Sequence, residues 1–301
     1  MSIVNTTVPI TAASCDRMIG EIVNTYPFCR SELLTTSAFQ RPIRTLVIGN
    51  GSRKVIYSAS HHANEWITSL VLLKFAEELA EGIVSKNREA LNLAETATIY
   101  MVPMVDPDGV DLVTGAIQPG SIQYQQAQAI SENFPAIPVP EGWKANLLGV
   151  DLNLQYPAGW LTAREIKFLQ GYDRPAPRDY VGRAPLNQLE SRALAGYTEY
   201  IDPALVLAYH AQGKEIYWQF QDYDIPGARE LGEKMASASG YTLADTPYTS
   251  SFAGYKDWFI QRFRRPGYTI EVGEGVNPLP LRQFEEIYRD NVPILTLAAL
   301  G

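Results

Sequence analysis

The sequence is poor in cysteine and has no excess of positive charge, and each shortage excludes a class of protein. Its two cysteines, Cys15 and Cys29, are too far apart for a paired-thiolate metal site and have no neighbouring histidine. We therefore expect buried free thiols rather than a disulfide. The formal net charge of −8 provides no basic surface for nucleic acid or for an anionic membrane, so we expect neither partner.

Long apolar runs are also missing. The first ten residues contain no basic segment followed by an apolar core, and no later run approaches the length of about 20 residues that a membrane span needs. We expect a cytoplasmic protein. A hydrophobic content of 46% over 301 residues is sufficient for a large buried core.

Strand and helix patterns alternate along the chain. Apolar runs rich in Val, Ile and Tyr predict strands at 45–49, 54–60, 97–105, 204–211 and 268–272. Helical spacing of apolar residues predicts helices at 65–84, 189–201, 228–238, 255–263 and 281–300. This alternation predicts an α/β fold in which helices cover both faces of the sheet.

Two long segments, 117–143 and 158–185, interrupt this pattern and contain several prolines. We expect both to be surface loops, and loops of this length usually form the walls of a functional site. Neither is typical of a linker, because strand patterns resume on both sides. The sequence thus predicts one catalytic domain over 1–301, with about residues 1–40 packed on it as an N-terminal extension.

Two of the three histidines lie where a strand is expected to lead into a helix. His62 and Glu65 form an H-x-x-E pair that suits Zn²⁺ but needs a third, distant ligand. His210 also follows an apolar strand and could reach the same sheet edge. Alone, His62 would more often be a capping residue and His210 a buried core residue. Their shared position at strand ends favours a metal site.

Hydrolysis at a metal site also needs a carboxylate that is not a ligand, to take a proton from water. Glu271 is the candidate, because an acid in the strand pattern Y-T-I-E-V-G needs a functional or ionic partner. The alternative is a salt bridge to Arg264 or Arg265, just upstream.

Together these motifs resemble the zinc metallocarboxypeptidase family. The resemblance rests on H-A-N-E-W-I-T, D-P-D-G, G-V-D-L-N, Y-H and Y-T-I-E-V, which occur in the order typical of the family. It implies a single α/β domain with a mixed sheet of about eight strands between helices. It also implies one Zn²⁺ per chain, bound by His62, Glu65 and His210, with Glu271 as the general base.

The resemblance also separates matching positions from departures. His61 has no role in the family, so we expect it to be structural. Asn153 matches the asparagine that holds the substrate's terminal carboxylate, but the expected arginine beside it is Leu154, which cannot clamp a carboxylate. Lys144 stands where the family usually has an arginine that stabilises the oxyanion, and it keeps the positive charge.

Four further residues are expected to contact substrate. Tyr248 aligns with the family's mobile tyrosine, although it could equally be a packed loop residue. Lys256 lies at the expected base of the specificity pocket, where it would favour a side chain ending in a carboxylate, unless it is a solvated helix residue. Arg178 and Arg183 could bind other substrate carboxylates or could be surface charges.

The missing clamp, the spare cations and H-A-Q-G-K-E-I-Y-W resemble the bacterial subgroup that cleaves γ-D-glutamyl bonds to diaminopimelate in peptidoglycan peptides. This implies a zinc peptidase that acts on soluble muropeptides. One alternative is a conventional carboxypeptidase that binds the terminal carboxylate through Asn153 and a cation such as Lys144 or Arg183. The other is an inactive zinc-binding or peptide-binding module, which would have no need of Glu271.

Overall fold

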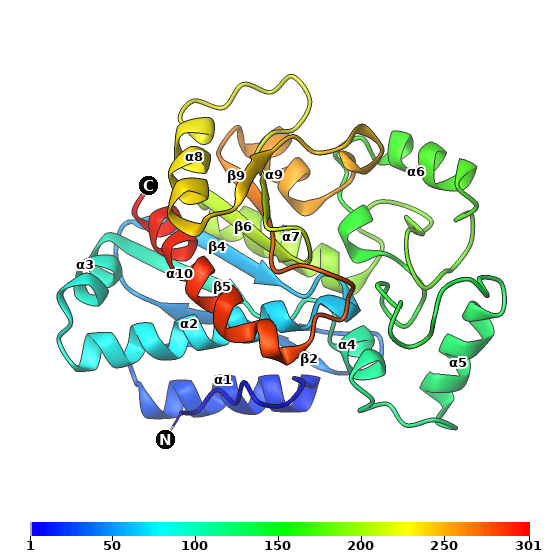
Figure 1. Cartoon of the computed structure of the whole chain (residues 1–301), viewed down its shortest axis with the longest axis horizontal. Coiled ribbons are helices and arrows are strands. Elements are labelled where there is room, and N and C mark those ends of the chain that lie inside the picture. The colour runs from blue at the N-terminus through cyan, green and yellow to red at the C-terminus, as the bar shows by residue number, and fades with distance from the viewer. Residues whose placement is uncertain (1) are drawn as a thin grey trace.

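A twisted, mixed sheet of seven strands runs through the molecule (Figure 1). In this computed structural model, which describes residues 2–301, the strand order is β3-β5-β4-β6-β9-β7-β8. Its strands are β3 (Leu46–Ile48), β4 (Arg53–Ala59), β5 (Ala97–Val102), β6 (Leu205–His210), β7 (Glu215–Tyr217), β8 (Thr242–Ala244) and β9 (Gly267–Glu271). The four central strands, β5, β4, β6 and β9, are parallel, whereas β3 and β7 pair antiparallel with their inner neighbours.

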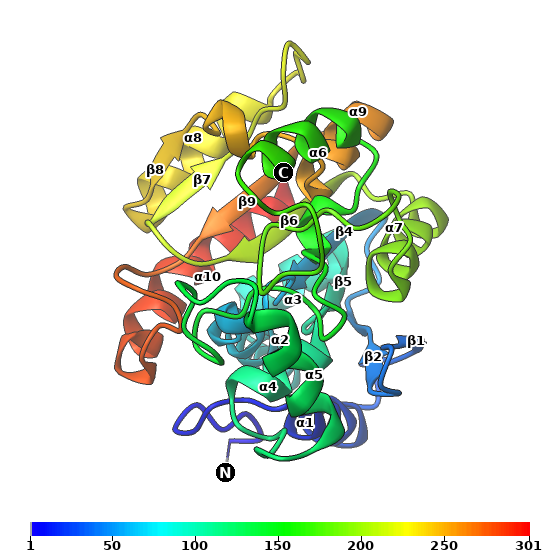
Figure 2. The ribbon, with the colours of Figure 1, turned by 90° about the vertical axis from the view of Figure 1, so that its right-hand side faces the viewer.

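Helices cover both faces of this sheet. Within residues 2–301 the α-helices are α1 (Ala12–Thr25), α2 (Ile67–Val84), α3 (Arg88–Thr96), α4 (Pro107–Val113), α5 (Ile122–Ser131), α6 (Trp160–Leu169), α7 (Leu189–Ile201), α8 (Ala228–Ser239), α9 (Tyr255–Phe263) and α10 (Phe284–Leu300). Single 3₁₀ turns are η1 (Ala63–Glu65), η2 (Leu152–Leu154), η3 (Tyr248–Ser250) and η4 (Leu281–Gln283). Helices α1, α2, α8 and α10 pack on one face, and α7 and α9 on the other (Figures 1 and 2).

The period-two pattern of the strands decides which side chain faces which helix layer. In β4, Val55 and Tyr57 belong to the core beneath α2 and α10, and Ile56 belongs to the core beneath α7 and α9. In β6, Leu207 likewise belongs to the core beneath α2 and α10, and Val206 belongs to the core beneath α7 and α9. Both faces are therefore apolar, as a parallel sheet between helices requires.

The predicted α/β fold with a mixed sheet between helices is confirmed, with two differences of detail. The main sheet has seven strands rather than about eight, because β1 (Leu33–Thr36) and β2 (Pro42–Arg44) pair only with each other. The two long loops each contain a helix, α5 and α6. Their polar composition hid α5, which begins at a Ser121 cap and buries only Ala127.

The parallel strands place the site. Strands β4, β6 and β9 end at the same edge, where His210 pairs in register with Glu271. The segment that carries α4, α5 and α6 lies over this edge, facing the viewer in Figure 2. The two segments expected to be loops therefore help to enclose the carboxyl ends of the strands.

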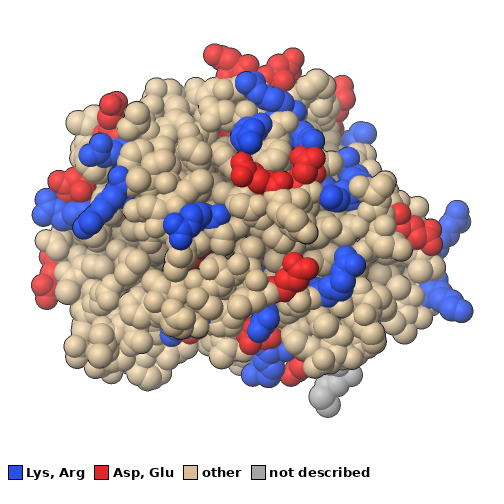
Figure 3. Space-filling view, turned by 180° about the vertical axis from the view of Figure 1, so that it is seen from behind, with Lys and Arg blue, Asp and Glu red and all other residues tan. Residues whose placement is uncertain are grey.

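The surface agrees with the composition. On the face shown in Figure 3, acidic and basic side chains are interspersed. None of the helices between residues 2 and 301 combines the length and apolarity that a membrane crossing requires. Cys15 and Cys29 are free thiols buried in the core, and burial raises the pKa of each to about 12.

Candidate active site

Three side chains converge at the carboxyl edge of the sheet. His62 follows β4, Glu65 lies on η1 three residues later, and His210 is the last residue of β6. Their ligand atoms lie within 4.8 Å of one another. The sequence motif and the parallel register of β4 and β6 together produce this cluster, because each strand delivers its last residues to one place.

The donor set fits a metal cation. His62 Nε2 lies 3.1 Å from Asp151 Oδ1 and donates its proton there, so Nδ1 of a neutral His62 carries a lone pair. That lone pair faces Glu65 Oε1 at 3.0 Å and His210 Nδ1 at 3.2 Å. Lone pairs and a carboxylate directed at one point favour a positive charge between them, and two imidazoles with a carboxylate suit Zn²⁺.

The neighbouring charges also shift the pKa values of His62 and Glu65. Burial lowers the pKa of His62, but the carboxylates of Glu65 and Asp151 outweigh burial and raise it to about 9. The site thus attracts positive charge to His62, and a bound metal ion and a proton compete for it. Burial raises the pKa of Glu65, yet His62 and Lys144 hold it well below the usual value, so Glu65 stays ionised.

Asp151 orients the first ligand and has no role in the sequence prediction. Besides His62, its carboxylate accepts hydrogen bonds from the backbone N–H groups of Asn153 at 3.1 Å and Asp179 at 3.2 Å. A carboxylate behind a metal-binding imidazole fixes the ring and raises its basicity. The signal was present, because Asp151 stands two residues before Asn153 in the G-V-D-L-N motif.

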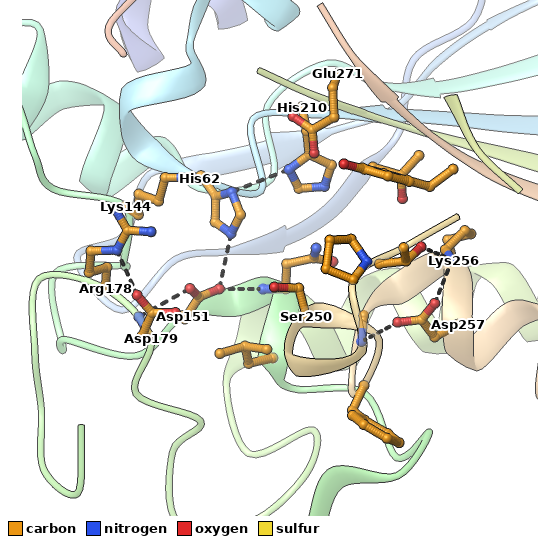
Figure 4. Close-up of a pocket in the computed structure, with 18 of the residues that line it drawn as sticks. His62, Lys144, Asp151, Arg178, Asp179, His210, Ser250, Lys256, Asp257 and Glu271 are labelled. Carbon is orange, nitrogen blue, oxygen red and sulfur yellow. Dashed lines mark hydrogen bonds and ion pairs between the residues drawn. The ribbon is translucent and has the colours of Figure 1, made fainter. Parts of the chain in front are cut away.

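Glu271 lies at the end of β9, beside His210 and pointing into the same space (Figure 4). Among residues 2–301 its carboxylate has no hydrogen bond or ion pair, and the alternative salt bridge is not formed. Arg265 instead pairs with Asp202 at 2.7 Å, and Arg264 stacks on Tyr223. Burial, together with the negative charge of Glu65, raises the pKa of Glu271 to about 8.

Lys144 reaches the cluster from just after the first long segment. Its Nζ lies 2.7 Å from Glu65 Oε1. Its backbone is fixed from both sides, because the Ala63 N–H donates to the Lys144 carbonyl at 3.1 Å and the Lys144 N–H donates to the Pro177 carbonyl at 2.8 Å. The first ligand pair, Lys144 and the second long segment are thereby held together.

A pocket of about 250 Å³ opens beside the three candidate ligands and reaches α9. Asn153 and Leu154 line it, so leucine occupies a wall where the family has a carboxylate clamp. Lys256 also lines it, but its buried ammonium group is 2.7 Å from Asp257 and 2.6 Å from the Gln219 carbonyl. The pocket therefore carries a cation that is partly neutralised by a neighbouring acid.

The remaining expected contacts differ in position. Arg178 lines the pocket next to Lys144 (Figure 4) and donates from Nε to Asp179 at 2.6 Å. Arg183 is exposed and lies outside the pocket lining. Tyr248 is 67% exposed on η3, with its ring against Phe252 and outside the pocket lining, although η3 itself borders the pocket.

His61 packs beneath the candidate ligands. It is fully buried, its ring stacks on His210 with centroids 5.6 Å apart, and its Nε2 lies 3.2 Å from the Tyr156 hydroxyl. Burial holds its pKa well below the usual value, so the ring is neutral. His61 therefore packs against His210 from beneath and supports its ring.

Lys167 is a pocket residue that the sequence did not indicate. It lies on α6, lines the pocket and pairs with Asp179 at 2.5 Å. The segment was expected to be a loop, but the helix-forming residues of α6 were the signal for a helix, and Lys167 lies at helical spacing from the buried Trp160 and Ala163.

Known proteins agree with this architecture. A solved structure of bovine thrombin-activatable fibrinolysis inhibitor superposes with a TM-score of 0.75 at 15% identity, over 98% of this chain and 97% of the other. The murein-tripeptide amidase MpaA from Escherichia coli O157 superposes with a TM-score of 0.54 at 20% identity, over 88% and 91% of the two chains. These likenesses show the fold.

Sequence comparison gives the family. The chain is 39% identical to gamma-D-glutamyl-L-diamino acid endopeptidase 1 of Lysinibacillus sphaericus over 280 residues, which are 92% of this chain and 68% of that protein. The family model for zinc carboxypeptidases matches residues 16–294. The chain therefore belongs to the zinc carboxypeptidase family and is a metallopeptidase.

Proposed function

We propose that this protein is a zinc-dependent peptidase that hydrolyses the γ-D-glutamyl–diaminopimelate amide bond of soluble peptidoglycan peptides in the cytoplasm. The observation that carries the proposal is Leu154 on the pocket wall, because leucine cannot bind the α-carboxylate that an ordinary carboxypeptidase clamps. The relative from Lysinibacillus sphaericus, which is named for cleavage of γ-D-glutamyl bonds to a diamino acid, supports the same bond.

The pocket suits a leaving group that carries both a positive and a negative charge. Lys256 and Lys167 supply ammonium groups, and Asp257 and Asp179 lie beside them as carboxylates. The side chain of diaminopimelate ends in an amine and a carboxylate, so it is complementary to such a lining. The amide of Asn153 on the same wall supplies a further hydrogen-bonding group.

The reaction follows from the positions of the side chains. Held by His62, Glu65 and His210, zinc would supply Lewis-acid activation of water and of the scissile carbonyl. Glu271 takes the proton from the attacking water and passes it to the leaving amine nitrogen. The ammonium group of Lys144 stabilises the negative charge that develops on the carbonyl oxygen.

Two expected contacts belong to the outer part of the site. Tyr248, at the rim of the pocket, would turn inward over bound substrate and donate its phenolic hydrogen. Arg183 would meet only a substrate that extends across the surface beyond the pocket.

Product analysis tests the proposed bond. The zinc-loaded protein is incubated with L-Ala-γ-D-Glu-meso-diaminopimelate and, separately, with an α-linked tripeptide, and the products are identified by mass spectrometry. We expect L-Ala-D-Glu and free diaminopimelate from the first peptide and little cleavage of the second. The Glu271→Gln variant is the control, and we expect it to keep its zinc and lose at least about 10³-fold in kcat, because it cannot accept the proton.

Either of two results would contradict the proposal. Cleavage of the α-linked peptide alone, abolished by amidation of its C-terminal carboxylate, would show a conventional carboxypeptidase. Full activity in Glu271→Gln would remove that residue from the mechanism.

A further inference from the structure

A second cavity, of about 580 Å³, adjoins the pocket beside the candidate zinc ligands. The two cavities share four lining residues: Lys144, Arg178, Tyr217 and Glu271. A peptide whose scissile bond lies beside Glu271 therefore extends into both. Since the first pocket is assigned to the leaving diamino acid, the second cavity receives the acyl part.

The acyl part of a γ-D-glutamyl bond differs chemically from that of an ordinary peptide. Its scissile carbonyl is the side-chain carbonyl of glutamate, so three carbon atoms separate that carbonyl from the free α-carboxylate. An α-linked peptide has a carboxylate at this distance only when its acyl residue is itself glutamate. A cation at this place would give that carboxylate a charge-assisted hydrogen bond, which is stronger than one between neutral groups.

Charged groups are few in the second cavity. Its lining consists of apolar residues, glycines, carboxamides and the phenol of Tyr217, apart from the three charged side chains Lys144, Arg178 and Glu271. Lys144 is already paired with Glu65 at 2.7 Å. Arg178 uses Nε for Asp179, and among the described residues its two terminal nitrogens have no hydrogen bond or ion pair.

The backbone holds Arg178 in this position. The carbonyl of the preceding Pro177 accepts from the N–H groups of both Lys144 and Ala145, at 2.8 and 2.9 Å. On the other side, the Asp179 N–H donates to Asp151, which in turn contacts His62. The backbone on either side of Arg178 is thus linked to Lys144 by one neighbour and, through Asp151, to His62 by the other.

We propose that Arg178 binds the free α-carboxylate of the γ-D-glutamyl residue on the acyl side and so favours γ-D-glutamyl substrates over peptides that lack a carboxylate at this place. The inference rests on the proposed function, and it assigns recognition of the acyl-side carboxylate to Arg178. The free terminal nitrogens of a guanidinium form the fork that a carboxylate accepts in bidentate fashion.

The test compares two substrates that differ only at this group. One is L-Ala-γ-D-Glu-meso-diaminopimelate, and the other is the same tripeptide with the D-glutamate α-carboxylate replaced by a carboxamide. The enzymes are the zinc-loaded wild type, Arg178→Gln and Arg174→Gln. Arg174 is the matched control, because it pairs with the adjacent Asp173 at 2.8 Å in the same segment but lies outside both cavities.

We expect the wild type to prefer the carboxylate substrate by about 10- to 100-fold in kcat/KM, the usual range for a charged hydrogen bond. Arg178→Gln should lose that preference through a higher KM for the carboxylate substrate and keep its activity on the carboxamide. Arg174→Gln should resemble the wild type. Asp179 retains Lys167 as a partner in Arg178→Gln, and zinc content and thermal unfolding report whether that variant is folded.

Two results would overturn the inference while leaving the proposed function intact. An equal loss on both substrates in Arg178→Gln would show that Arg178 acts on the reacting carbonyl or on the fold. An unchanged preference in Arg178→Gln would show that another group reads the carboxylate. If the wild type cleaves neither γ-linked substrate but does cleave an α-linked peptide, the proposed function itself is wrong and the inference falls with it.

Discussion

Among single residues, the buried carboxyl groups differ most in how they are stabilised. Asp108 is paired with Arg41 at 2.8 Å. Glu190, at the start of α7, is only 2% exposed, and its Oε1 has no partner within residues 2–301. Burial, with a smaller contribution from the negative charge of Asp108, raises the pKa of Glu190 to about 7. Glu190 is therefore neutral in the folded protein at mildly acidic pH.

This makes stability depend on pH. The pKa of Glu190 is higher in the folded state than the usual 4.5, so its favourable protonated form is lost as pH rises from about 4.5 through about 7. Glu190→Gln, which cannot ionise, should be more stable than the wild type at pH 8, by on the order of 2 kcal/mol, and nearly equal at pH 5. Urea midpoints at the two pH values measure the difference.

The matched control is Glu95→Gln, because Glu95 is exposed on α3. Glu95→Gln should leave the difference between the urea midpoints at pH 5 and pH 8 the same as in the wild type. A Glu190→Gln variant that is destabilised equally at both pH values would show that Glu190 contributes through packing and not through ionisation.

At the scale of elements, α4 is wedged against the site. Gly109, in its first turn, has no space for a side chain, since an added Cβ would lie 2.6 Å from the Ala145 carbonyl oxygen and 2.7 Å from the Ala63 Cβ. These two residues flank Lys144 and the first ligand pair. The position of α4 therefore affects how far Lys144 lies from the candidate metal site.

Gly109→Ala should lower the free energy of unfolding by about 1–3 kcal/mol, because the backbone must shift to admit one methyl group. It should also lower kcat, since Lys144 and η1 move apart. Gly196→Ala is the control: Gly196 lies within α7 with nothing within 4 Å of an added Cβ, so alanine should stabilise by about 0.5–1 kcal/mol. Chemical denaturation measures the free energy of unfolding of both variants. Equal changes in the two would contradict the close packing of α4 against Ala63 and Ala145.

At the scale of the whole molecule, the candidate metal site joins parts of the chain that are far apart. It links the end of β4 with the end of β6, and through Asp151 it reaches the second long segment. A metal that binds only when these parts are together stabilises the fold by mass action.

Removal of zinc with a chelator should lower the midpoint of thermal unfolding by on the order of 5–10 °C, and added zinc should restore it. Glu271→Gln should show the same shift, because Glu271 is not a ligand. Glu65→Gln should show little or none. Calorimetry with measured zinc content checks this, and an equal shift in Glu65→Gln would remove that residue from the ligand set.

The fold and the meeting of the candidate metal ligands were largely predictable from the local sequence pattern. Alternating apolar residues identify the central strands, and His62, Glu65, His210 and Glu271 follow or end three of them. Parallel strands bring their carboxyl ends to one edge, so position in the strand pattern is enough to predict their meeting. The helix α5 was hidden by its polar composition, whereas α6 consists largely of helix-forming residues and was missed because several prolines follow it in the same segment.

What the sequence by itself determined is therefore the set of residues that strand ends deliver to one place, because strand direction and side-chain alternation are local properties. Only the tertiary structure decided which loop residues join them. Arg178 lies in the site and Arg183 does not, because the Pro177 carbonyl accepts hydrogen bonds from the backbone of a segment more than thirty residues away. Contacts between distant segments depend on how both pack, and no local pattern records them.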